Sequence, residues 1–265
     1  MSVKQDLLFR LVESQNYSKI SKQIERFISD YVSEAHPFAK GLIIGLSGGL
    51  DSSVVLKLST NALGSKNVLG LLMPTSVTPS EDTMHAIELA EALKVQYKMI
   101  GLDPLMERFE KVLPNDKRAK GNLTARVRMS LLYYYAFVSK YLVAGTGDKS
   151  EYYIGYFTKY GDGGADIMPI AHLYKTQVRA LARHLRIPNA IIEKKSSPRL
   201  WADHLAEEEI GMNYETIDCV LHFMIDKKMK PAEIAKRMQM QRKQVDKIRN
   251  MVENNTHKRK MPEIL

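Results

Sequence analysis

The chain has 265 residues, of which 45% are hydrophobic and 26% charged, so it can bury the core of one large α/β domain. No stretch approaches the roughly 18 uninterrupted apolar residues of a membrane span, and charges interrupt the N-terminus where a signal peptide has its apolar segment, so we expect a cytoplasmic protein without membrane contact. The single cysteine, Cys219, excludes an internal disulfide, and its apolar helical surroundings predict a buried, unreactive thiol.

The first half of the chain alternates helical and β-rich patterns. Residues 5–34 have apolar positions at helical spacing, which predicts one or two amphipathic helices. β-rich runs follow at 41–46, 68–73, 95–101 and 141–146, and helical stretches lie between them at about 51–63, 80–93 and 120–139. This alternation predicts an α/β fold, a doubly wound, mainly parallel sheet with helices on both faces.

The second half contains fewer regular patterns. Residues 147–170 are rich in Gly and Asp and predict a loop, a helix is expected at about 174–185, and residues 193–211 predict a mobile surface loop before further helices from about 214. We expect a single domain over 1–265. It comprises a helical segment (1–36), a nucleotide-binding core (37–190), a lid-like loop (191–212) and a basic helical segment (213–265).

The net charge of +9 is concentrated near the end of the chain. Residues 226–260 hold twelve Lys and Arg against four Asp and Glu, a surplus of +8. Such a segment indicates either a polyanionic partner or a solvated helical face.

The stretch 45–53, GLSGGLDSS, follows the first predicted strand. In a parallel sheet this strand-to-helix turn is the usual phosphate site. Gly48 and Gly49 permit positive φ and close approach of backbone amides to an anion, and the next helix directs its positive end there. Serine hydroxyls at 47, 52 and 53 add donors. The loop therefore predicts phosphate binding.

Asp51 is the unusual residue of this loop. The loop matches neither G-x-x-x-x-G-K-[ST] nor G-x-G-x-x-G. A carboxylate beside phosphates repels them unless a cation stands between, so Asp51 predicts Mg²⁺ bridging to a polyphosphate. Glu151 follows the fourth strand at the same sheet edge, so the two carboxylates can share the ion.

The S-G-G-x-D-S pattern at 47–52 resembles the loop of the ATP pyrophosphatase (PP-loop) superfamily. Three further blocks, at 122–136, 145–182 and 256–262, are similar to those of the NAD synthetase family in its short, ammonia-dependent form. The resemblance implies an adenine nucleotide alpha hydrolase-like fold and a homodimer. It also implies amidation of deamido-NAD by ammonia, with ATP as co-substrate, to give NAD, AMP and pyrophosphate through an acyl-adenylate.

The resemblance also assigns residues. The ATP-binding residues would be Gly45, Leu46, Ser47, Gly48, Gly49, Leu50, Asp51, Ser52, Thr146, Lys175 and Ser197. The Mg²⁺ ligands would be Asp51 and Glu151, and the deamido-NAD-binding residues would be Arg126, Lys159, Asp166, His257 and Lys258. The neighbouring Arg128 is an alternative to Arg126.

Three of these residues are catalytic candidates. Asp51 would hold the metal, and the Lys175 ammonium can neutralise the charge that grows on the leaving pyrophosphate. Asp162, in the polar loop TKYGDGGAD, is a candidate for taking a proton from ammonium.

The chain departs from the family in the lid-like loop. Pro198 follows Ser197 where relatives place proline before the hydroxyl residue, and Ala206 replaces the first Asp of an acidic motif. Both departures lie in the lid-like loop, so they bear on the closure of that loop and on the role of Ser197.

Other interpretations remain open. Another PP-loop enzyme, a tRNA-modifying thiolase or a GMP synthetase core, shares the loop but needs cysteines or different later blocks. Residues 230–250 have helix-turn-helix spacing and a basic face, although pairs of short helices are common in cores and we expect no nucleic acid partner. Glutaminase domains rely on a cysteine, so we expect free ammonia unless a separate subunit delivers it. The N-terminal helix is our candidate for part of the dimer interface.

Overall fold

A four-stranded parallel sheet forms the centre of the computed structural model, which describes residues 3–35, 39–201 and 204–264. Its order is β3-β2-β1-β4, and the strand bounds are β1 Gly41–Gly45, β2 Val68–Leu72, β3 Gln96–Met99 and β4 Tyr141–Ala144. The predicted strands and their parallel arrangement are confirmed.

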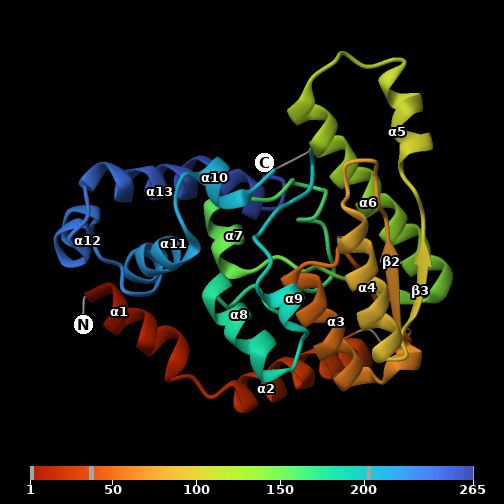
Figure 1. Ribbon diagram of the computed structural model, residues 1–265, viewed down its shortest axis with the longest axis horizontal. Helices are drawn as coiled ribbons and strands as arrows, with labels where there is room; N and C mark the ends of the chain where they lie inside the picture. The colour runs from red at the N-terminus through yellow and green to blue at the C-terminus, as the bar shows by residue number, and fades with distance from the viewer. Residues whose placement is uncertain (1–2, 36–38, 202–203, 265) are drawn as a thin grey trace.

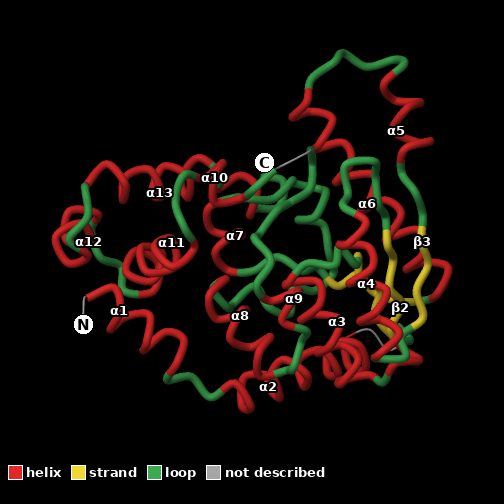
Figure 2. The backbone as a smooth tube through the Cα atoms, in the orientation of Figure 1, coloured by secondary structure: helices red, strands yellow, loops and turns green. Residues whose placement is uncertain are grey.

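Helices and connecting loops make up the rest of the described chain (Figures 1 and 2). The helix bounds are α1 Val3–Leu8, α2 Tyr17–Asp30, α3 Leu50–Leu63, α4 Ser80–Ala92, α5 Asp103–Glu110, α6 Lys117–Ser139, α7 Lys149–Ile154, α8 Lys175–His184, α9 Asn189–Ile192, α10 Ala206–Ile210, α11 Tyr214–Leu221, α12 Pro231–Met238 and α13 Arg242–Asn254. Three π-helical turns are η1 Phe9–Glu13, η2 Tyr31–Ala35 and η4 His222–Asp226, and two 3₁₀-helical turns are η3 Ser65–Asn67 and η5 Thr256–Arg259. No described helix is long and apolar enough to cross a membrane.

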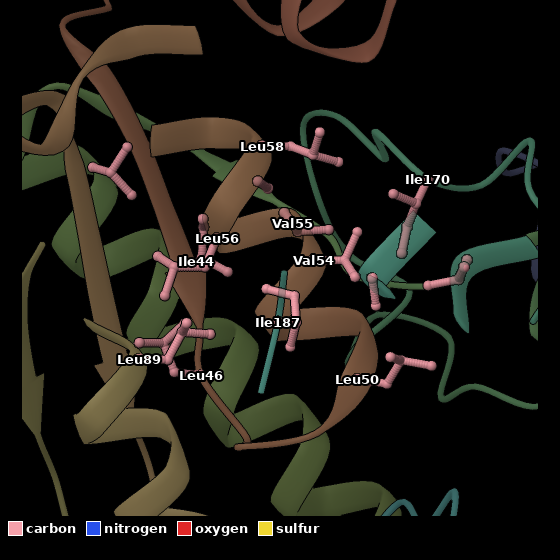
Figure 3. Packing of buried hydrophobic residues seen from close by; sticks show 14 of the residues in the cluster. Ile44, Leu46, Leu50, Val54, Val55, Leu56, Leu58, Leu89, Ile170 and Ile187 are labelled. Atoms are coloured by element: carbon pink, nitrogen blue, oxygen red, sulfur yellow. The ribbon is translucent and has the colours of Figure 1, made fainter. Parts of the chain in front are cut away.

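Alternate strand residues face two different layers. Leu42 and Ile44 point into a core closed by α2, α3, α4 and α8, where Figure 3 shows Ile44 beside Leu56 of α3. Ile43 points to the opposite face, which α5 and α6 cover. Because both faces of the sheet are buried, its strands read as continuous apolar runs.

A third core joins the two ends of the chain. Apolar residues of α1 and η1 pack with those of α10, α11, α12 and α13, away from the sheet (Figure 1). Ile234 of α12 and Val245 of α13 are fully buried here. The basic segment with helix-turn-helix spacing therefore uses its apolar positions to build this core.

Two predicted loops contain helices. Residues 147–170 were expected to be a loop, but α7 forms because the Asp148 side chain accepts the Glu151 amide at 2.8 Å, and Gly155 ends the helix at φ 72°. Within 193–211, α10 forms because Ala206 and Ile210 bury one face in the third core. Those two loop predictions were wrong at these residues.

Candidate active site

The order in which the parallel strands are added to the sheet reverses between β1 and β4. From β1 the chain proceeds to β2 and β3 on one side and then returns to β4 on the other. Ligands of open α/β sheets bind at the carboxyl ends of the strands at such a point. A pocket of about 460 Å³ lies here, lined by the loops that leave β1 and β4.

The loop after β1 is shaped by Gly48, whose φ is +69°. A Cβ at this position would lie 1.8 Å from the carbonyl oxygen of Asp82. Gly49, expected to use the same freedom, has φ −94° and serves instead as the N-cap of α3. No side chain caps α3, so the amides of its first turn face the pocket without an intrahelical acceptor.

The serine hydroxyls of the loop are divided between the pocket and the backbone. Ser47 lines the pocket. Ser52 and Ser53 are buried, and each donates to the Gly49 carbonyl, at 3.2 and 2.8 Å. Ser53 therefore stabilises the loop rather than facing a ligand.

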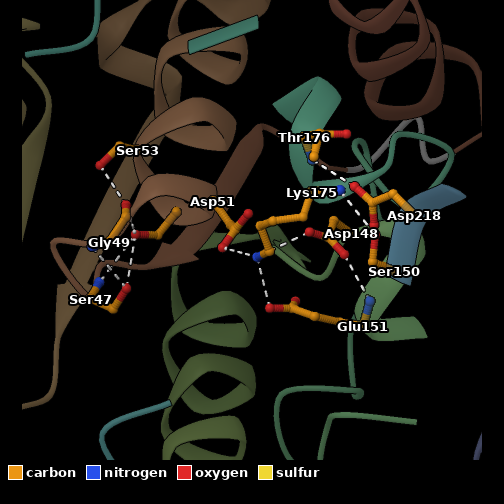
Figure 4. A network of polar contacts seen from close by, with 11 residues as sticks. Ser47, Gly49, Asp51, Ser53, Asp148, Ser150, Glu151, Lys175, Thr176 and Asp218 are labelled. Carbon is orange, nitrogen blue, oxygen red and sulfur yellow. Dashed lines mark hydrogen bonds and ion pairs between the residues drawn. The ribbon is translucent and has the colours of Figure 1, made fainter. Parts of the chain in front are cut away.

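Lys175, at the start of α8, lies beneath this loop with three carboxylates around its ammonium (Figure 4). Its side chain is 0% exposed, and Nζ lies 2.8 Å from Asp51, 3.0 Å from Asp148 and 2.8 Å from Glu151. The three predicted charged residues thus converge, together with Asp148, which was not predicted. The spacing Asp148-x-x-Glu151, typical of a helix start, is the signal that could have found it.

Burial and mutual repulsion shift the ionisation of this cluster. Burial raises the pKa of Glu151 to about 8 and that of Asp148 to about 7, although Lys175 opposes both shifts. Burial alone would lower the pKa of Lys175, but the carboxylates outweigh it and raise that pKa well above its usual value. With all groups ionised the cluster carries a charge of −2, which suits a further cation.

Two buried oxygens of the cluster, Asp51 Oδ1 and Asp148 Oδ2, have no hydrogen-bond partner in the described structure. Asp148 Oδ2 pairs with the Lys175 ammonium at 3.0 Å, which leaves Asp51 Oδ1 for that cation. Within the described residues no group of three or more His, Cys, Asp or Glu is arranged to hold a metal. Mg²⁺, however, commonly takes one or two carboxylates and completes its shell with substrate phosphates and water, so Asp51 and Glu151 fit such an ion.

A segment after α9 closes the pocket from the other side. Residues 194–201 line it, and two of their cations bind one buried carboxylate, with Lys194 at 2.7 Å and Arg199 at 2.8 Å from Asp82. Lys194 also donates to the Gly48 carbonyl at 3.2 Å. Asp82 was missed from the sequence because its neighbours come from a distant segment.

Thr146 and Ser197 both line the pocket. The Ser197 hydroxyl donates to the carbonyl of His204 within its own segment. The ATP-binding roles of Thr146 and Ser197 stay predictions.

The residues predicted to bind deamido-NAD divide into two groups. Lys258 lines the pocket, as does Arg128, the alternative to Arg126, whose Nε donates to the Met73 carbonyl at 3.2 Å. The catalytic candidate Asp162 also lines the pocket. Asp162 accepts the Thr158 amide at 2.8 Å.

The other four residues lie outside the pocket lining. Arg126 donates to the Lys159 carbonyl at 3.3 Å, and Lys159 donates to the His257 carbonyl at 2.7 Å, so these three lie together. Asp166 instead accepts the Val143 amide at 2.7 Å beside β4. Their substrate contacts stay predictions.

The basic C-terminal residues pack on α7. Lys258 donates to the carbonyls of Gly155 and Phe157 at 2.6 and 2.9 Å, and Arg259 donates to that of Tyr153 at 2.7 Å. These cations occupy the carbonyl end of the helix that carries Glu151, where the helix dipole favours positive charge.

Comparisons with known proteins agree with this geometry. The family model described as NAD synthase matches residues 20–262. The NH(3)-dependent NAD(+) synthetase of Hyperthermus butylicus is 48% identical over 250 residues, 93% of this chain and 90% of that protein. Two solved structures have a TM-score of 0.81. The NH3-dependent NAD synthetase of Campylobacter jejuni, in complex with the nitrate ion, is 33% identical. The match covers 95% of this chain and 100% of that structure's chain. The NMN synthetase of Francisella tularensis is 32% identical, with 95% and 99% covered.

Proposed function

Because the chain belongs to the NAD synthase family, we propose how its pocket carries out the family's reaction. The chain catalyses the ATP-dependent amidation of deamido-NAD by ammonia. The nicotinate carboxylate attacks the α-phosphorus of ATP, and pyrophosphate leaves. Ammonia then attacks the carbonyl of the acyl-adenylate, giving NAD and AMP.

The observation that carries the proposed arrangement is the position of Lys175 below the uncapped N-terminus of α3. The amides at the start of α3 lie at the pocket where the triphosphate would bind, and the buried Lys175 ammonium lies directly behind the pocket residues Asp51 and Glu151. Such fixed positive groups stabilise charge that develops on a leaving phosphate, and a closed pocket excludes the water that would hydrolyse the adenylate.

We propose that Asp51 and Glu151 hold Mg²⁺ together with the phosphates. The unpartnered Oδ1 of Asp51 and the excess of three carboxyl groups over one ammonium in the cluster support this assignment. The ion would supply neutralisation of phosphate charge.

Asp51→Asn should weaken activation by Mg²⁺ while leaving the fold intact. The amide keeps the size of the side chain but removes its charge, so we expect the Mg²⁺ concentration for half-maximal activity to rise by about 10- to 100-fold. Titration of NAD formation with Mg²⁺ measures this shift. An unchanged titration curve would exclude Asp51 as a metal ligand.

We propose that the second group of deamido-NAD residues acts at the interface of a homodimer. Arg126, Ser130, Tyr133, Tyr134 and Phe137 lie on one exposed face of α6, at helical spacing. Phe137 is 88% and Tyr134 63% exposed, and such an apolar face favours burial against another protein. A second copy of the chain packed on this face would also cover Arg126. The predicted deamido-NAD residues that lie outside the pocket would then contact the dinucleotide at the interface between the two copies. This position differs from the N-terminal helix that the sequence favoured.

Phe137→Glu should dissociate this homodimer. A charge in the centre of an apolar interface lacks a partner when buried, so we expect monomers at micromolar concentration and a raised KM for deamido-NAD. Sedimentation velocity measures the mass, with Phe27→Glu on α2 as the matched control at another exposed phenylalanine. If only the control variant became monomeric, the interface would lie at the N-terminal helix.

The reaction is tested by incubating the protein with ATP, Mg²⁺, ammonium and deamido-NAD. NAD, AMP and pyrophosphate should form in equal amounts, in keeping with a cytoplasmic biosynthetic enzyme. A parallel reaction with nicotinate mononucleotide checks whether the activity named for the Francisella relative is shared. Preference for the mononucleotide would overturn the dinucleotide assignment but keep the ATP site. Glutamine in place of ammonium tests the nitrogen source.

A further inference from the structure

A fully buried carboxylate lies behind the Lys175 cluster and outside the pocket. Asp218 of α11 is 0% exposed and is not among the residues that line the pocket. Its Oδ1 accepts the Ser150 hydroxyl at 2.5 Å, and its Oδ2 accepts the Thr176 amide at 2.9 Å (Figure 4). The Ser150 oxygen in turn accepts the Lys175 amide at 3.0 Å.

These bonds connect the first turns of two helices. Ser150 of α7 directly precedes Glu151, and Thr176 of α8 directly follows Lys175. One carboxylate therefore holds the immediate neighbours of a proposed metal ligand and of the ammonium that meets the leaving group.

The third helix of this arrangement provides a rigid support. The neighbours of Asp218 on α11, among them Ile217 and Val220, are 0% exposed in the core formed by the two ends of the chain. Movement of Asp218 relative to the sheet would require repacking of that core.

We propose that Asp218 is a positioning residue for the amidation reaction. It sets the distance between the Lys175 ammonium and the Glu151 carboxylate by fixing the helix ends that carry them. This inference rests on the proposed function. It adds that the C-terminal helical core determines the geometry of the ATP site.

The directions of the hydrogen bonds show why a carboxylate is required. The Ser150 hydroxyl donates its single proton to Asp218, and its oxygen accepts the Lys175 amide. The backbone N–H of Thr176 also donates to Asp218. Both oxygens of Asp218 must therefore accept. An asparagine has one accepting oxygen and one NH₂ group, so it either sets donor against donor or forces the Ser150 hydroxyl to turn and accept instead, and the charge-assisted bond at that end is lost either way.

Asp218→Asn tests the inference in the full-length enzyme. Misplacement of catalytic groups by about 1 Å can cost about 100-fold in rate, so we expect kcat to fall by about 10- to 100-fold while the KM for deamido-NAD changes little. Ser150→Ala removes the same connection from its other end and should give a similar loss. Because both changes break one connection, the double variant should lose little more activity than either single variant.

Val220→Ala is the matched control. It removes two methyl groups from the same helix without touching the carboxylate, so it should lower Tm and leave kcat unchanged. If Asp218→Asn lowered Tm like the control but kept wild-type kcat, Asp218 would only stabilise the fold. If the losses in the double variant multiplied, Asp218 and Ser150 would act independently, and the proposed connection would be wrong. Failure of the wild-type protein to make NAD would instead overturn the proposed function.

Discussion

Replacing Lys175 with methionine should destabilise the protein and reduce catalysis more than any other change of one side chain considered for this site. The substitution leaves three carboxylates around an apolar chain. Removal of one partner from a buried ionic group typically costs about 3–5 kcal/mol of unfolding free energy. Loss of the cation that we propose stabilises the leaving pyrophosphate should lower kcat by about 100- to 1,000-fold.

The loss of stability should depend on pH in a defined direction. The folded-state pKa of Glu151 is raised from 4.5 to about 8, so the folded protein holds more protons than the unfolded chain between these values, and its stability falls as pH rises through that window. Without Lys175 the carboxylates prefer the protonated form even more strongly. Urea unfolding should therefore show a larger loss for Lys175→Met at pH 8 than at pH 6.

Lys149→Met provides the matched control for this experiment. Lys149 pairs with Asp226 at 2.7 Å and is partly buried, but it lies outside the Lys175 cluster. We expect a smaller, less pH-dependent loss of stability and near wild-type kcat. Equal behaviour of the two variants would contradict the role of the carboxylate cluster.

Gly48→Ala should displace the phosphate-binding loop. The added Cβ would meet the Asp82 carbonyl at 1.8 Å, and φ at this position is +69°. Strain of this kind costs about 1–3 kcal/mol. Relief of the clash moves the loop, and a displacement of about 1 Å should reduce kcat/KM for ATP by about 100-fold.

Gly64→Ala separates backbone strain from displacement of the loop. Gly64 also has positive φ, +77°, but no atom lies within 4 Å of the added Cβ, and it stands at the other end of α3. Thermal unfolding should show destabilisation in both variants, larger in Gly48→Ala because of the added clash, whereas ATP kinetics should change only in Gly48→Ala. A loss of ATP affinity in Gly64→Ala would indicate that the stability of α3, and not the loop clash, governs binding.

The central elements could be predicted because their signals are local. The strand at 41–45 is a continuous apolar run, and the helix after it begins at a glycine-rich turn, so neighbouring residues alone determine both. The short helix α7 could not be separated from a loop by composition. It depends on the cap at Asp148, and that residue is held by Lys175 from a different helix.

The sequence by itself predicted the chemistry that we propose for the site: a loop for phosphate, a carboxylate that calls for a cation, and a lysine that opens a later helix. Residue type and spacing carry this information because amides, charges and glycine conformations act over a few residues. Only the tertiary structure decided which charges meet. Asp148 beside Lys175, Asp82 beneath Lys194 and Asp218 behind Ser150 join segments far apart in the chain. These contacts arise from how the helices pack on the sheet and on each other, and no local pattern encodes that packing.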